Sequence, residues 1–378
     1  MTGERYERAS HATPPRARSR RGRPAVTDEV WSAQDTSPAE IEAALRELLV
    51  HHHAEVAHDA PARVLNLIAI VDREWRGEVE NRLEKVGRYH ASRTVLCAVD
   101  PRRTTIDARV RLIADDSPQA GEFSLTHEHV VVDIGEQHLK SLDTIVDPLV
   151  VTDLPTMAWA PHGHHAGIDA VMRLSQVVLL DTVSEPSIED GLNWARGLAD
   201  RAYVVDLAWL RSTPWRERIA ATFDPPVFRP QLGAITGVSA RHHPDSGVAG
   251  VLLFGWLASR LGWTPGSLAA RGRDGGLAGR AKTRRHEITL ELEPAPEQSV
   301  PGLAGITIET AQGTRIQLDR GPGGLRAKRV TRKGHEIEWT VLGASRGEAG
   351  ILGEGIRQAL LRDPTYRPAL DAATQMVS

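Results

Sequence analysis

RVLNLIAIV, residues 63–71, is a nearly continuous run of apolar side chains, and RTVLCAV, residues 93–99, is a second run of the same kind. Short apolar runs without polar alternation predict strands that are buried on both faces. Residues 74–89 lie between the two runs and repeat apolar side chains at helical spacing, at Val79, Leu83 and Val86. A strand, a helix and a second strand in this order predict a βαβ unit with a right-handed crossover.

The alternation of apolar runs and amphipathic segments continues along the chain. Further strands are expected near residues 106–113, 128–134, 156–159, 175–182 and 202–209, and further helices near residues 139–149, 188–200 and 214–223. Several strands and helices in alternation favour a layered α/β domain with a mostly parallel central sheet.

The stretch FDPPVFRP, residues 223–230, is dense in proline and predicts a domain boundary. A strand at residues 232–238 and an apolar helix at residues 247–261 are expected to follow. Short runs of alternating polarity then predict an antiparallel meander, closed by a helix at about residues 346–361. The predicted organisation is an α/β domain over residues 38–224 and a smaller α+β domain over residues 225–378.

The first 37 residues differ from the rest of the chain. Seven arginines stand against Glu4 and Glu7 in the first 25 positions, and prolines interrupt them. Such a segment buries too little apolar area to offset its ordering entropy, so residues 1–37 are expected to be a disordered basic tail. A nucleic-acid-binding arm is the weaker hypothesis. Order is expected to begin at Ser37–Glu40, where Ser37 and Glu40 have the spacing of a capping box.

Composition excludes several classes of protein. Cys97 is the single cysteine, so the chain forms no intramolecular disulfide, and its apolar surroundings predict a buried thiol. The longest apolar stretch, Val248–Ala258, is too short to cross a membrane, and the polar N-terminal segment does not resemble a secretory signal. The net charge of −3 gives no support for a protein that binds nucleic acid or membranes through its overall field. A cytoplasmic protein is predicted.

No stretch of the sequence carries a specific catalytic or nucleotide motif. GPGG, residues 321–324, lies between predicted strands and is interpreted as a hairpin turn, because a phosphate loop must lead into a helix. His127 and His129 alternate on a predicted strand, and His162, His164 and His165 lie in a loop, but neither group has the spacing of a zinc site. We therefore predict no catalytic residues, no metal and no cofactor.

The stretch DLAWLRSTPWRER, residues 206–218, places two tryptophans beside arginines. These residue types dominate protein–protein hot spots, because an indole buries a large area and a guanidinium pairs with carboxylates. We therefore expect candidate partner-binding residues here, namely Trp209, Arg211, Thr213, Pro214, Trp215 and Arg216. The alternative is structural: Trp209 would fill the sheet edge at the end of a strand, and Thr213 and Pro214 would cap and begin a helix.

Residues 271–285 are rich in glycine and arginine and are expected to form a loop. This segment contains six cationic side chains and one carboxylate, that of Asp274. The loop is a candidate site for a phosphate group or an acidic partner, through Arg280, Lys282, Arg284 and Arg285. The alternative is a solvated excursion of the chain.

Four segments together resemble one known family, the glucose-6-phosphate dehydrogenase assembly protein OpcA. They are residues 63–71, HASRTVLCAVDP at 90–101, VDPLVVTDLPTMAWAP at 146–161 and DLAWLRSTPWRERIAATFD at 206–224. The resemblance extends from about residue 38 to the end of the chain. Ala91 departs from the pattern, since a proline is usual at this position.

The resemblance implies a non-enzymatic partner of glucose-6-phosphate dehydrogenase. Such proteins promote the active assembly of the enzyme and raise its activity, which supplies NADPH through the oxidative pentose phosphate pathway. The alternative hypothesis is a sugar-phosphate-binding enzyme or sensor that uses the crevice of the α/β domain, with the basic loop 271–285 closing over the phosphate.

Overall fold

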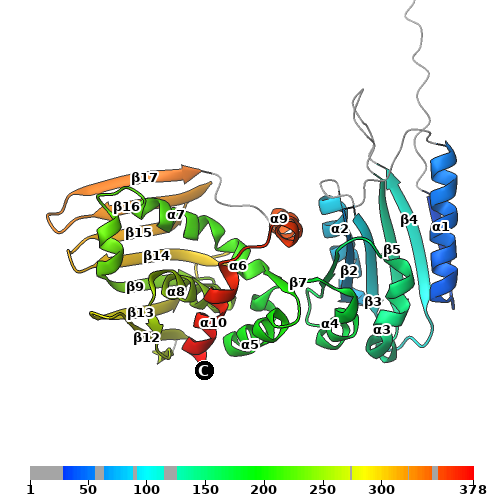
Figure 1. Ribbon diagram of the computed structural model, residues 1–378, viewed down its shortest axis with the longest axis horizontal. Coiled ribbons are helices and arrows are strands. Elements are labelled where there is room, and N and C mark those ends of the chain that lie inside the picture. Colours follow the sequence, from blue (N-terminus) through cyan, green and yellow to red (C-terminus); the bar gives the residue numbers. More distant parts are fainter. Residues whose placement is uncertain are drawn as a thin grey trace, which may run out of the picture.

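A computed structural model describes residues 29–55, 64–87, 92–114, 126–272, 275–321, 323–342 and 348–378. Its strands form two separate sheets, which lie at opposite ends of the molecule (Figure 1). The sheet of the first half is rich in parallel strands and the sheet of the second half in antiparallel strands, so the predicted fold class is confirmed. Among the described residues, no helix is both long and apolar enough to cross a membrane.

The first sheet has eight strands in the order β1-β4-β5-β3-β2-β6-β7-β8. The six strands from β5 to β8 run parallel to one another, and β4 and β1 extend that sheet antiparallel. Their bounds are β1 Glu29–Ala33, β2 Leu65–Asp72, β3 Ser92–Val99, β4 Asp107–Ala114, β5 Thr126–Ile134, β6 Thr156–Trp159, β7 Val177–Leu180 and β8 Tyr203–Asp206.

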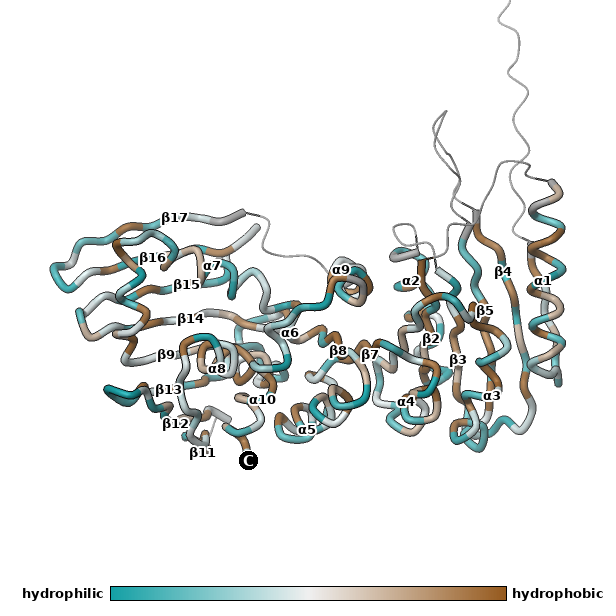
Figure 2. Tube along the Cα trace, in the orientation of Figure 1, coloured by the Kyte–Doolittle hydropathy of each residue, from teal (hydrophilic) through white to brown (hydrophobic). Residues whose placement is uncertain are grey.

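Burial explains why these residues form the centre of the sheet. All eight residues of β3 and seven of the eight in β2 are buried, as expected for strands covered on both faces. Figure 2 shows β2, β3 and β5 among the hydrophobic parts of the chain. Cys97 lies in β3, and burial raises the pKa of its thiol to about 12. The prediction of a buried cysteine is confirmed.

The helices of the first half are α1 Pro38–Glu55, α2 Arg76–Gly87, α3 Leu142–Val146, α4 His165–Val171, α5 Ile188–Ala199, α6 Leu207–Arg211 and α7 Thr213–Phe223. The chain moves from β2 to β3 in one direction across the sheet and from β6 to β8 in the other. Because crossovers between parallel strands are right-handed, α2 lies on the opposite face from α4 and α5. The sheet is therefore layered between helices.

The second sheet has the strand order β10-β12-β13-β9-β14-β15-β16-β17, with β11 paired to β12. Only β9 and β13 pair in parallel. The strands are β9 Ile235–His242, β10 Thr264–Pro265, β11 Ala269–Arg271, β12 Gly276–Lys282, β13 Glu287–Pro294, β14 Leu303–Thr310, β15 Arg315–Gly321, β16 Gly324–Val330 and β17 Glu336–Leu342. Helix α8, Gly247–Leu261, contacts β9 and β13.

Two C-terminal helices connect the halves. Helix α9, Glu348–Leu361, follows the last strand of the second sheet but packs on α2, α6, β7 and β8 of the first half. Helix α10, Tyr366–Val377, packs on α5 and α8. Figure 1 shows α9 between the two sheets. The division at residues 224 and 225 stays a prediction, and the chain crosses that division twice.

Several local predictions are confirmed. Ser37 and Glu40 form the capping box at the start of α1, since the Glu40 carboxylate accepts from the Ser37 backbone N–H at 2.8 Å and the Ser37 hydroxyl accepts from the Glu40 N–H at 3.3 Å. The GPGG segment connects β15 and β16, whose end residues Gly321 and Gly324 pair across a hairpin. Pro322 of this turn lies outside the described residues.

Other local predictions are wrong. Residues 29–33 belong to the predicted disordered tail but form β1, which pairs antiparallel with β4; residues 1–28 lie outside the described part of the chain. Residues 139–149 hold 3₁₀ turns and the short α3 instead of one helix. The predicted loop at residues 271–285 contains β12, because residues 276–282 pair with both β11 and β13.

Candidate functional site

The signature DLAWLRSTPWRER runs from the end of β8 through α6 into α7. Asp206 ends the strand, and its carboxylate caps α6 by accepting from the Ala208 N–H at 3.0 Å. The predicted strand therefore stops three residues early, and Trp209 lies on a helix. Ser212, not Thr213, occupies the N-cap position of α7, and Thr213 and Pro214 form its first turn.

Most of the signature side chains are buried. Trp209 is 2% exposed, Trp215 is 1% exposed and Arg216 is 7% exposed. Thr213 and Pro214 are half-buried. The Arg216 guanidinium lies 3.4 Å from the centre of the Trp209 ring and donates to the Trp209 carbonyl at 3.2 Å. In this conformation the two tryptophans offer almost no surface to another molecule.

Asp363, in the connection between α9 and α10, is the partner of the signature. The Trp209 indole Nε1 donates to its carboxylate at 2.8 Å, and Arg216 lies 3.7 Å from the same oxygen. The other carboxylate oxygen accepts from the Thr365 N–H and hydroxyl at 2.8 and 2.6 Å. Burial raises the pKa of Asp363, but these hydrogen bonds and the Arg216 charge outweigh it and hold the pKa below its ordinary value.

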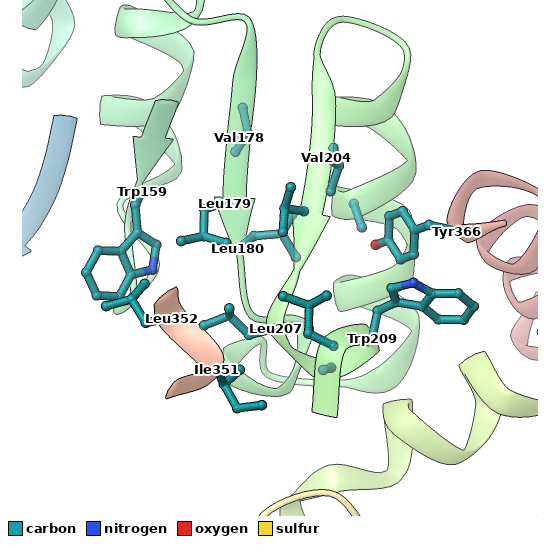
Figure 3. Packing of buried hydrophobic residues seen from close by; sticks show 14 of the residues in the cluster. Trp159, Val178, Leu179, Leu180, Val204, Leu207, Trp209, Ile351, Leu352 and Tyr366 are labelled. Atoms are coloured by element: carbon teal, nitrogen blue, oxygen red, sulfur yellow. The ribbon is translucent and has the colours of Figure 1, made fainter. Parts of the chain in front are cut away.

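Asp206 makes a second contact between the signature and the C-terminal helices, because it accepts a hydrogen bond from Tyr366, the first residue of α10. Its carboxylate accepts from the Thr182 N–H and hydroxyl at 3.2 and 2.9 Å and from the Tyr366 hydroxyl at 3.2 Å. Burial, with the nearby charge of Asp181, raises the pKa of Asp206 to about 7. Figure 3 shows the Tyr366 ring beside the Trp209 indole, and the ring centres are 5.5 Å apart.

Helix α9 packs against the same end of the first sheet. Ile351 and Leu352 are buried and lie near Leu207, Leu179 and Trp159 at the ends of the first-half strands (Figure 3). The helix approaches the sheet closely at Gly355, where a Cβ would lie 3.0 Å from the Leu179 methyl group.

Arg211 and Trp215 are also used internally. Arg211 pairs with Asp181 after β7 at 2.7 Å, and its side chain is 9% exposed. Trp215 lies on α7 with the Arg320 guanidinium of β15 6.0 Å from its ring. Arg329 of β16 donates to the Thr222 carbonyl at 2.7 Å at the other end of α7. The signature thus ties the two halves of the molecule together.

A second candidate region lies where the strand order of the first sheet reverses. The order β5-β3-β2-β6-β7-β8 is that of dinucleotide-binding domains, which bind their ligand at the carboxyl ends of the two central strands. Here those ends carry Asp72, the last residue of β2, and His162 and His164 after β6. His164 lies 3.2 Å from the Asp72 carboxylate, and His162 stacks on Trp75 at 4.8 Å.

These residues do not fit a dinucleotide. A pyrophosphate needs glycines that allow close backbone approach and free N–H groups at the start of the following helix. The turn here reads DREWRG, residues 72–77, and carries the carboxylates of Asp72 and Glu74 and the indole of Trp75. Its two arginines, Arg73 and Arg76, pair with Asp100 and Asp133. Sequence reasoning missed this region because the strand order emerges only from pairing, and no glycine motif marks it.

The other histidines named from the sequence lie on β5 and at the start of α4. His127 and His129 lie on β5 and are buried, and burial with nearby arginines lowers the pKa of His129 to about 4. His165 pairs with Glu185 at 2.8 Å and stacks on Trp194 at 4.0 Å. Within the described ranges, no group of three or more histidine, cysteine or acidic side chains gathers as a metal ion would require.

The structure divides the predicted basic site into two parts. Arg280 and Lys282 lie on β12 and both pair with Glu287 of β13, at 2.9 and 3.9 Å. Arg284 and Arg285 lie on the turn between these strands, where they line a pocket. Figure 1 shows β12 on the second sheet, away from β2, so the segment does not close over the crevice of the first sheet.

The fold and the signature together define an α/β protein with two sheets. Its first sheet has the strand order of a dinucleotide-binding domain, but the turn after β2 lacks the glycines that bind a pyrophosphate in such domains. Residues 53–194 match the family model described as the glucose-6-phosphate dehydrogenase subunit N-terminal domain, and residues 202–370 match the model of its C-terminal domain. The chain belongs to the OpcA family, and the resemblance inferred from the sequence is confirmed.

Similar proteins with the same family name occur in cyanobacteria. An OxPP cycle protein OpcA from Synechocystis sp. is 27% identical over 131 residues, which are 34% of this chain and 28% of the relative. One from Nostoc punctiforme is 23% identical over 228 residues, which are 57% of this chain and 48% of the relative. The match thus spans less than half the length of either relative.

Solved structures with a similar arrangement include two dehydrogenases. UDP-N-acetylglucosamine 3-dehydrogenase GnnA from Acidithiobacillus ferrooxidans is 12% identical with a TM-score of 0.42, over 83% of this chain and 97% of that one. Scyllo-inositol dehydrogenase from Lactobacillus casei is 12% identical with a TM-score of 0.43, over 84% and 96% of the chains.

Proposed function

We propose that this protein is a non-enzymatic assembly factor and allosteric activator of glucose-6-phosphate dehydrogenase, which it binds in the cytoplasm. The observation that carries the proposal is the match of residues 53–194 and 202–370 to the two domains of a glucose-6-phosphate dehydrogenase subunit. The names of the cyanobacterial relatives refer to the oxidative pentose phosphate cycle and support the same pathway. Activation there would raise the supply of NADPH.

The residues at the strand-order reversal support a role other than catalysis. Asp72 and Glu74 would repel a pyrophosphate, and Trp75 stacks on His162 in the region that a dinucleotide would need. The first sheet thus has the strand order of a dinucleotide-binding domain. The side chains at the reversal of that order instead contact one another within the protein. The buried signature acts in this proposal as a positioning element that fixes the relative placement of the two sheets.

Activation requires that the protein bind the active form of the dehydrogenase more tightly than the inactive form. A difference in binding free energy of about 1.4 kcal/mol shifts the equilibrium between the two forms tenfold. The protein needs no reactive group for this effect. The shape and charge of its surface are sufficient.

The proposal is tested with purified glucose-6-phosphate dehydrogenase from the same organism. Adding the full-length protein is expected to raise enzyme activity at low substrate, to lower the substrate KM, and to shift the enzyme to a larger species in gel filtration. An unrelated protein at the same concentration is the control. Unchanged activity, KM and elution volume would show that the proposed function is wrong.

A further inference from the structure

A pocket of about 520 Å³ lies between the end of α8 and the turn that joins β12 to β13. Trp263, Ile235, Leu232 and Leu261 give it apolar walls, and Arg260, Arg284 and Arg285 surround it with positive charge. These residues come from three separate segments of the second half, so folding assembles the pocket.

The three guanidiniums are available for a ligand. Within the described part of the chain, no carboxylate lies within ion-pair distance of Arg260, Arg284 or Arg285, whereas Arg280 and Lys282 nearby both pair with Glu287. All three arginines are exposed. Unpaired arginine beside an aromatic and aliphatic surface is the composition of a protein-binding hot spot.

The turn holds its two arginines in a defined place. The Thr283 hydroxyl accepts from the Arg285 N–H at 3.1 Å and from the His286 N–H at 2.9 Å. The His286 ring is bonded to the Ile235 carbonyl at 2.7 Å, which ties the turn to β9. Arg284 and Arg285 therefore project from a fixed turn, and their ordering is partly complete before any partner arrives.

The same hydrogen bonds argue against a phosphate ligand. Phosphate sites in proteins present free backbone N–H groups, commonly at a helix N-terminus. Here the N–H groups of Arg285 and His286 already donate to Thr283, and α8 contributes its C-terminal end. The apolar walls would gain nothing from a phosphate. Carboxylates carried beside an apolar side chain satisfy both the charges and the walls.

We propose that this pocket binds an acidic segment of glucose-6-phosphate dehydrogenase. Carboxylates of that segment pair with Arg284 and Arg285, and an apolar side chain lies against Leu261 and Leu232. The inference rests on the proposed function, since it names the surface of this protein that meets the enzyme. Fork-shaped guanidiniums suit this contact because each can bind a carboxylate through two parallel hydrogen bonds.

The test is the double variant Arg284→Glu/Arg285→Glu in the full chain, with binding to the dehydrogenase measured by surface plasmon resonance across a salt series. The wild-type protein is expected to bind more weakly as salt rises. The variant is expected to bind about tenfold more weakly at low salt, mainly through a slower association rate, and to lose most of the salt dependence.

A hairpin near the opposite edge of the same sheet provides a matched control. The turn between β16 and β17 carries Arg332 and Lys333 after Thr331, whose hydroxyl accepts from the His335 N–H at 3.2 Å. The variant Arg332→Glu/Lys333→Glu makes the same charge change on the same sheet and is expected to bind like wild type. Melting temperatures of both variants equal to that of the wild-type protein would show that neither change acts through unfolding.

Three results would overturn the inference while leaving the proposed function intact. They are wild-type binding by the Arg284/Arg285 variant, an equal loss in both double variants, and saturable binding of inorganic phosphate in calorimetry that only the Arg284/Arg285 variant loses. If wild-type protein does not bind the dehydrogenase at all, the proposed function itself fails. The two failures are therefore distinguishable.

Discussion

The indole Nε1 of Trp209 donates a hydrogen bond of 2.8 Å to the carboxylate of Asp363, across 154 positions of the chain. This bond joins the family signature of the first half to the connection between the last two helices. Arg216 stacks on the same indole and faces the same carboxylate, so one acidic side chain satisfies two buried signature residues. The signature thus has a structural partner within its own chain.

Replacing Asp363 is expected to destabilise the protein. Asp363→Ala leaves the Trp209 N–H and the Arg216 guanidinium buried without this acceptor, at a cost of about 2 kcal/mol in the free energy of unfolding. Urea unfolding measures the change. Asp245→Ala, at an exposed carboxylate, is the control and is expected to cost less than about 0.5 kcal/mol. An unchanged urea midpoint in Asp363→Ala would contradict the assigned contact.

A double-mutant cycle isolates the bond itself. Trp209→Phe removes the N–H but keeps an aromatic ring beside Tyr366. If the contact is direct, the effects of Trp209→Phe and Asp363→Ala are expected to be less than additive, with a coupling of about 1 kcal/mol. Fully additive effects would mean that the two side chains act on stability independently.

Two glycines in helices are expected to respond in opposite directions to the same substitution. In α8, a Cβ on Gly255 would lie 2.2 Å from the Ala369 carbonyl oxygen of α10, so Gly255→Ala must separate the two helices and cost about 1–3 kcal/mol. In α5, nothing lies within 4 Å of a Cβ on Gly197, so Gly197→Ala is expected to stabilise by up to about 1 kcal/mol. Thermal unfolding of both variants checks the pair, and a stabilising Gly255→Ala would refute the packing of α8 on α10.

Asp206 is expected to make stability depend on pH. Its pKa is about 7 in the folded protein and near 4 in the unfolded chain, so the folded state binds the extra proton between these values. Stability from this group is therefore present at low pH and is lost as the pH rises from about 4 to about 7.

Asp206→Asn removes this titration while keeping an oxygen acceptor for Thr182 and Ala208. The unfolding free energy of the variant, relative to wild type, is expected to rise across the same interval by at most about 1.4 kcal/mol per pH unit. Urea unfolding at several pH values measures this difference. A difference that stays constant between pH 4 and 7 would show that Asp206 does not take up the proton on folding.

The turn after β2 is expected to exclude nicotinamide dinucleotides. A ligand present at about 100 times its Kd stabilises a protein by about 2.7 kcal/mol, which thermal unfolding detects readily. We expect no change in melting temperature with millimolar NAD or NADP, because Asp72 and Glu74 repel the pyrophosphate. A saturable rise in melting temperature would contradict the interpretation of this turn.

Strands that are buried on both faces could be predicted from the sequence. β2 and β3 are covered on both faces, and continuous apolar runs revealed them without any knowledge of their neighbours. The pairing order of the parallel strands was beyond reach, because every such strand has the same apolar character. The dinucleotide-type order and the unusual turn at Asp72 therefore went unpredicted.

The signature was recognised, but its location was not. Its tryptophans and arginines have the composition of an interface, and local sequence does not reveal whether that interface is with another protein or with a distant part of the chain. Asp363 and Tyr366, which decide the matter, are far away in sequence. The helix at residues 366–377 was not predicted at all.

The contact between Trp209 and Asp363 also bears on how the protein is made. A ribosome that adds about 5–20 residues per second needs roughly ten to thirty seconds to travel from the indole to its acceptor. During that interval the signature helix has emerged, and the whole second sheet is synthesised before the closing residues exist. Until then the first half lacks the helices that cover part of its apolar surface. Nascent chains of this protein are therefore expected to bind chaperones until residue 366 has left the ribosome.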